Sequence, residues 1–157
     1  MKTKKYPSVT LCNAVCAILM VVLLILQFTP FWELEGEPTS ISSYIWMPSD
    51  HADLTTHFEK VISSDHSINS MVMPAILQLV LPVAGIALFL YRKEGIWAGI
   101  ISVFAGLSGF WAYLGRPAYR LGSWQAPFAV SVLLLIAGVL TVLAFIKKNE
   151  WYFRKAQ

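Results

Sequence analysis

The residues best suited to chemistry lie in one polar stretch, residues 49 to 66, which reads SDHADLTTHFEKVISSDH. This stretch holds all three histidines of the chain and carries the triplet Ser-Asp-His at both of its ends. Two imidazoles and a carboxylate suit zinc, which in catalytic sites takes three protein ligands and keeps one position open. The ligands predicted for such a site are Asp53, His57 and His66.

An alternative interpretation of this stretch needs no metal. His51 and His57 are six residues apart, which separates them by about 120° around a helix. The stretch has neither an HExxH motif nor a pair of cysteines. Histidines in an acidic, water-facing segment are commonly solvated or cap a helix. We therefore prefer the solvated interpretation and retain zinc as the alternative cofactor.

A second group of polar or helix-breaking residues lies inside runs that are otherwise apolar, at Asn13, Gln27, Gln78 and Pro82. Pro82 has no amide hydrogen to donate to the carbonyl of Gln78, so a helix through both residues should kink there. Together these groups could line a polar pocket, or neighbouring helices could satisfy them separately. The same runs contain no Asp, Glu, Lys, Arg or His, which argues against a proton- or ion-coupled transporter.

Two arginines and two cysteines are the remaining side chains that could bind a ligand or react. Arg116 and Arg120 lie in a short polar segment, where they can pair with acidic side chains of the long polar segment. Binding of an anion or a lipid head group is the alternative for these arginines. Cys12 and Cys16 share one face of the first apolar run and are predicted to be packing residues.

The elements that position these residues follow from the composition. The chain has 157 residues, 57% of them hydrophobic and 13% charged, and its mean hydropathy of +0.61 is too high for a soluble domain. Four uncharged runs can each cross about 30 Å of hydrocarbon, and each must be helical to satisfy its own backbone. We predict one all-α membrane domain over residues 1–157, a four-transmembrane-helix bundle with spans at about 9–28, 71–90, 95–114 and 126–146.

The third run, residues 95 to 114, carries one continuous small face. Its small residues recur at intervals of four and three, which places them in a single stripe on a helix. Lipid tails are as apolar as the helices, so close backbone approach across small residues is what favours association. We predict that this run is the central packing helix, within the chain or between subunits, through Gly95, Gly99, Ser102, Gly106 and Gly109.

The distribution of charge predicts the orientation. Nine of the twelve basic residues lie before the first run, between the second and third runs, or after the fourth. The positive-inside rule makes this side cytoplasmic, so both termini are predicted to be cytoplasmic in a cytoplasmic or plasma membrane. No basic stripe is interleaved with aromatic residues, so nucleic acid is not an expected partner.

The long outer loop, residues 31–70, holds seven of the nine acidic residues. A short amphipathic helix is predicted over about residues 50–62, because Leu54, Phe58 and Val61 share one helical face. Loops of this length commonly carry structure or function in a compact domain.

In outline, four spans with a long first outer loop and a short second one resemble the layout of claudin-type tetraspan proteins. The resemblance is one of topology. That family's outer loop pairs a Gly-Leu-Trp motif with two cysteines, whereas this loop contains Tyr44, Ile45, Trp46 and Met47 and no cysteine. The chain is therefore not assigned to that family.

The preferred functional interpretation is a binding or assembly component that acts through the acidic outer loop. Its expected partners are membrane lipid and either another membrane protein or further copies of the chain. A metal-dependent membrane enzyme that uses the loop histidines is one alternative. A small channel or carrier, lined by Gln78 and the Pro82 kink, is another.

Overall fold

Four long helices dominate the computed structural model of the chain, which describes residues 8–34, 37–39, 66–115 and 122–155. All four are long and apolar enough to cross a membrane. This confirms the prediction of four such helices and indicates a multi-pass membrane protein. The helices are α1 (Val9–Leu26), α4 (His66–Tyr91), α5 (Trp97–Leu114) and α6 (Gln125–Lys155).

Two of the helices extend beyond the predicted spans. α4 begins at His66, five residues before the predicted start, and α6 continues to Lys155 rather than ending near Ile146. Hydropathy predicts only the part of a helix that crosses the hydrocarbon, whereas a helix can continue into polar sequence. α4 is helical through both Pro74 and Pro82. The predicted amphipathic helix at about 50–62 lies outside the described residues.

The segment that follows α1 contains a short β-pair, which is not among the predicted elements. Strands β1 (Trp32–Leu34) and β2 (Glu37–Thr39) pair antiparallel, with Trp32 opposite Thr39. Two residues separate the strands in sequence, and the second of them is Gly36. Glycine in a two-residue connection is a hairpin signal. Each strand has only three residues, so the long elements are all helical.

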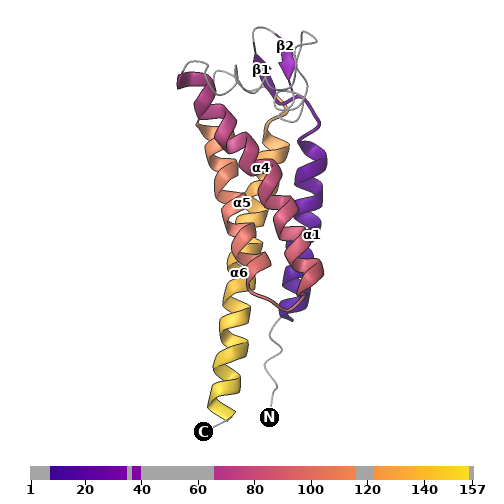
Figure 1. Ribbon diagram of the computed structural model, residues 1–157, viewed down its shortest axis with the longest axis vertical. Coiled ribbons are helices and arrows are strands. Elements are labelled where there is room, and N and C mark those ends of the chain that lie inside the picture. Colours follow the sequence, from indigo (N-terminus) through magenta and orange to yellow (C-terminus); the bar gives the residue numbers. More distant parts are fainter. Residues whose placement is uncertain (1–7, 35–36, 40–65, 116–121, 156–157) are drawn as a thin grey trace.

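The helices lie side by side in the order α1, α4, α5, α6 and back to α1, and α1 also contacts α5 across the bundle. The most extensive contact joins α5 and α6. In Figure 1 the start of α1, the α4–α5 connection and the end of α6 lie at one end of the molecule, which we call the turn end. The β1–β2 pair lies at the opposite end, the strand end, and the last turns of α6 extend beyond the other helices (Figure 1).

Buried apolar side chains form two clusters between the helices. One cluster joins α1, α5 and α6 through Met20, Leu23, Ala105 and Leu134, all with no exposed surface. The other joins α4 and α5 to Phe31 at the strand end, through Ala75, Ala112 and Tyr113. Met20 and Leu23 of the first cluster lie between Asn13 and Gln27 in the sequence of α1 and the residue after it.

The outward faces of the helices are also apolar. Large hydrophobic side chains remain exposed on every helix, including Ile18 at 63%, Val83 at 57%, Phe104 at 56% and Leu140 at 54%. A soluble monomer seldom exposes so much contiguous apolar surface. Lipid tails would cover this surface in a membrane, in agreement with the length of the helices.

Candidate functional site

Two helix backbones approach each other closely along the face that α5 presents to α6, which we call the α5–α6 seam. A Cβ atom built on Gly106 would lie 2.7 Å from the carbonyl oxygen of Ser131 and 2.8 Å from the amide nitrogen of Leu135. A Cβ atom on Gly138 would lie 2.7 Å from the carbonyl oxygen of Gly99. Backbone therefore packs directly against backbone along this seam, which only glycine permits.

Some residues of the predicted small stripe of the third run contact α6 at this seam, and others have contacts within their own helix or turn. Gly99 contacts Thr141, whose Cβ would lie 2.9 Å from an added Cβ, and Gly109 contacts the Ser131 side chain. Ser102 is buried and donates to the carbonyl oxygen of Ala98 in its own helix at 2.8 Å. An added Cβ on Gly95 would meet only Arg92, because Gly95 lies in the turn before α5.

The partners of the stripe on α6 were not identified from the sequence. Ser131, Gly138 and Thr141 lie seven and three residues apart, so they too form one face of a helix. Thr141 also lies 3.4 Å from the Cys16 sulfur, which joins α1 to the same face. A search for small or hydroxyl residues at these intervals on the fourth run would have found the seam from both sides.

Gln78 makes a polar contact between α4 and α5 in the interior. Its Nε2 donates to the carbonyl oxygen of Ala105 at 2.9 Å and to Ser108 Oγ at 2.6 Å. The side chain has no exposed surface. Its Oε1 has no hydrogen-bond partner among the described residues. The donor group of Gln78 thus ties the two helices together at one level.

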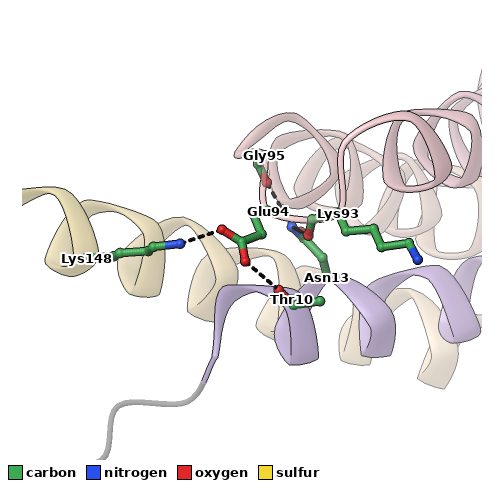
Figure 2. Close-up of polar contacts among 6 residues, drawn as sticks. All are labelled: Thr10, Asn13, Lys93, Glu94, Gly95 and Lys148. Atoms are coloured by element: carbon green, nitrogen blue, oxygen red, sulfur yellow. Dashed lines mark hydrogen bonds and ion pairs between the residues drawn. The ribbon is translucent and has the colours of Figure 1, made fainter.

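A second polar cluster lies at the turn end (Figure 2). Asn13 Nδ2 donates to the carbonyl oxygens of Lys93 and Gly95 at 2.9 and 2.8 Å. Between these two residues, Glu94 pairs with Lys148 of α6, the Nζ to Oε2 distance being 2.6 Å. These contacts connect the α4–α5 turn to α1 and α6.

Glu94 is the acidic residue of this cluster, and its side chain contacts both Lys148 and Thr10. The hydrogen bond and positive charge of Lys148 hold the pKa of the Glu94 carboxyl below its ordinary value, and burial opposes this shift. Thr10 Oγ1, 3.4 Å from Glu94 Oε1, adds a smaller effect in the same direction as Lys148. Glu94 is therefore ionised at neutral pH.

The third polar contact lies toward the strand end. Gln27 Nε2 donates to the Tyr113 hydroxyl at 3.2 Å and to the carbonyl oxygen of Leu23 at 3.3 Å. Both Gln27 and Tyr113 are fully buried. This contact connects α1 to α5, the pair of helices that face each other diagonally.

The structure does not bring the four residues of the predicted polar pocket together. Asn13 lies on α1, and Gln27 caps the end of that helix fourteen positions further on, which corresponds to about 21 Å along a helix. Gln78 lies at a level of its own, and Pro82 is buried in α4 one turn further on. Each amide instead has its own partners on a neighbouring element.

Two grooves on the outer faces have volumes of about 280 and 270 Å³. Both are open and lined almost entirely by apolar side chains, the exception being Ser108. Neither groove is lined by Asn13, Gln27 or Gln78. Grooves of this kind between helices are surfaces that lipid tails can fill.

The predicted metal and anion sites fall mostly on residues without a described position. Asp53, His57, Arg116 and Arg120 lie outside the described residues, and His66 is the first residue of α4. Within the described ranges, no three His, Cys, Asp or Glu residues are grouped so that they could hold a metal ion.

The polar groups of the described interior therefore hold the helices together. The side-chain amides of Asn13, Gln27 and Gln78 all donate hydrogen bonds to neighbouring elements. No family model, no curated protein and no solved structure matches the chain. What the protein does is accordingly inferred from its own residues.

Proposed function

We propose that this protein is a binding or assembly component of a cytoplasmic or plasma membrane that acts through its acidic outer loop. In this proposal the chain is one membrane domain, a four-transmembrane-helix bundle with both termini in the cytoplasm. Its partner is another membrane protein or further copies of the chain.

The observation that carries the proposal is the way the interior uses its polar groups. The amides of Asn13, Gln27 and Gln78 donate to neighbouring elements at three separate levels. Met20 and Leu23 lie between Asn13 and Gln27 along the first helix, with no exposed surface. A continuous polar path along the described helices is therefore not favoured, which supports binding over transport.

We therefore assign partner binding to the segments outside the helices. Residues 31–70 contain seven of the nine acidic residues of the chain. An acidic segment suits a partner with complementary positive charge, because such charge steers association and sets specificity. This is the basis for assigning the contact surface to the outer loop.

Site-specific photo-cross-linking in native membranes tests the proposal. A photoreactive residue at Glu37 should give one discrete adduct of higher mass, whereas the same residue at Leu133, an exposed apolar position on α6, serves as the matched control. Replacing Glu33 and Glu35 by Gln, with the photoreactive residue kept at position 37, should remove most of the loop adduct. Absence of any loop adduct, together with solute flux in liposomes that contain the purified protein, would favour the channel or carrier instead.

The proposed orientation has its own test. In a Cys12→Ala, Cys16→Ala background, single cysteines at Glu35 and Ser123 should react with a membrane-impermeant maleimide added to intact cells. A cysteine at Lys93 should react only after the membrane is opened. Reaction of the Lys93 position in intact cells would reverse the assignment of the two sides.

A further inference from the structure

The turn between α4 and α5 presents a second charged surface at the end opposite the β1–β2 pair. Arg92 and Lys93 are exposed there, and neither side chain has a hydrogen-bond or ion-pair partner within the described ranges. Two exposed aromatic residues flank them in sequence: Tyr91, the last residue of α4, at 89%, and Trp97, the first residue of α5, at 59%.

The turn that carries these cations is held in one conformation. The Arg92 amide donates to the carbonyl oxygen of Leu88 at 2.9 Å, and the Gly95 amide donates to that of Arg92 at 3.0 Å. From α1, the fully buried Asn13 side chain donates to the Lys93 and Gly95 carbonyl oxygens (Figure 2). Cations on a fixed turn lose less conformational entropy when a ligand binds them.

The one acid of the turn is directed away from this surface. Glu94 contacts Lys148 of α6 and Thr10 of α1. Figure 2 shows the Lys93 side chain extending in another direction, away from the Glu94 carboxylate. The local positive charge of Arg92 and Lys93 is therefore available to an external anion.

The position of the turn identifies the source of that anion. The membrane-crossing part of α4 ends at Tyr91 and that of α5 begins at Trp97. Tyrosine and tryptophan prefer the head-group level of a membrane, so the cations between them lie where lipid phosphates lie. We infer that the α4–α5 turn binds the phosphate of an anionic membrane lipid through Arg92 and Lys93.

The chemistry of the two side chains fits this ligand. The guanidinium of Arg92 can donate two parallel hydrogen bonds to phosphate oxygens, and the Lys93 ammonium adds a point charge. Tyr91 and Trp97 would pack beside the glycerol and upper acyl region, which distinguishes a lipid from a free phosphate ion. This site is separate from the outer loop and does not depend on the partner proposed for that loop.

Native mass spectrometry of the detergent-solubilised full chain tests the inference, with phosphatidylglycerol and phosphatidylcholine as the probes. The wild-type chain should bind phosphatidylglycerol more tightly than phosphatidylcholine. Each basic residue near an anionic surface contributes about fivefold in affinity, so Arg92→Gln combined with Lys93→Gln should weaken phosphatidylglycerol binding by about 25-fold. Binding of phosphatidylcholine should not change.

Two matched variants make the result specific. Arg92→Lys combined with Lys93→Arg keeps both charges and should retain the preference for phosphatidylglycerol. Arg154→Gln combined with Lys155→Gln removes the same charge from the end of α6 and should also retain it. Unchanged phosphatidylglycerol binding in the Arg92→Gln, Lys93→Gln variant would overturn the inference, as would an equal loss in the Arg154→Gln, Lys155→Gln variant.

A further arm separates lipid from free phosphate. Phosphatidylglycerol should raise the melting temperature of the wild-type chain, and inorganic phosphate at the same concentration should not. Equal stabilisation by inorganic phosphate would overturn the assignment to lipid. Circular dichroism of each variant before lipid is added checks that the helices are intact.

Discussion

The contacts of α5 with α6 and of α1 with α4 both depend on glycine, yet they differ in what the glycine faces. On α6, Gly138 faces the backbone of α5, at the Gly99 carbonyl oxygen and the Val103 amide nitrogen. On α4, Gly85 faces the sulfur and terminal methyl group of Met20, and these atoms approach an added Cβ even more closely. A methionine side chain can move by rotation about its own bonds, whereas a helix backbone moves only with the whole helix. The loss of stability caused by adding a methyl group at each glycine should therefore depend on whether a side chain or a helix backbone has to move, and not on the distance alone.

The largest expected effect is at the α5–α6 seam. Gly138→Ala places a methyl group 2.7 Å from the Gly99 carbonyl oxygen, so α5 and α6 must separate. Overpacking of this kind costs about 1–3 kcal/mol, and we expect the upper part of that range. Thermal unfolding in detergent measures the loss, with Leu107→Ile, an exposed position on α5, as the control.

The contact between α4 and α5 through Gln78 is expected to contribute less. Gln78→Leu removes the donors to Ala105 and Ser108, and hydrogen bonds between membrane helices contribute about 0.6 kcal/mol on average. A double-mutant cycle with Ser108→Ala isolates the side-chain part of this energy. A coupling energy indistinguishable from zero would mean that the Gln78–Ser108 hydrogen bond contributes nothing to stability.

At the contact between α1 and α4, a small change is predicted. Gly85→Ala brings a methyl group against Met20, which can rotate away, and alanine favours the helix by about 0.5–1 kcal/mol relative to glycine. We therefore expect a melting temperature close to that of the wild type. If Gly85→Ala destabilises the protein as much as Gly138→Ala does, the distinction between the two contacts is wrong.

The smallest effect is predicted at the turn end, where Glu94 joins α6 to the α4–α5 turn. Its folded-state pKa lies below the ordinary value of 4.5, so its contribution to stability is present above that pH and is lost as the pH falls through the folded value. The wild type should melt slightly higher than Glu94→Gln at neutral pH, and this difference should vanish on acidification. A difference that persists in acid would show that Glu94 acts through something other than its charge.

The number of membrane-crossing helices could be predicted because hydrophobic length alone determines it. The residues that contact each other between helices could not be predicted, because each helix has several faces. Which helix lies against which face is decided only when the whole chain packs. Gly99 and Gly106 belong to a stripe of small residues that the spacing reveals, whereas Gly138 and Ser131 are two small residues seven positions apart in a run rich in Leu, Val and Ile. The spacing of the stripe also leaves open whether it packs within the chain or between subunits.

The predicted pocket illustrates a different limit. Asn13 and Gln27 are fourteen positions apart in the predicted first span, which implies about 21 Å along a helix, so a single pocket that contained both could have been excluded from the sequence. What the sequence could not reveal is that Asn13 would donate to the two carbonyls beside Glu94. Such a contact with a turn depends on the position of α1 against that turn.

The most direct test of this account is the response of the protein to Gly106→Leu. Gly106 faces the backbone of Ser131 and Leu135 in the same chain, so the account predicts a large fall in melting temperature with no change in the mass of the solubilised particle. Both quantities can be measured on one preparation, by thermal unfolding and by light scattering. A particle of smaller mass with an unchanged melting temperature would contradict the account, because the stripe would then be a contact between subunits.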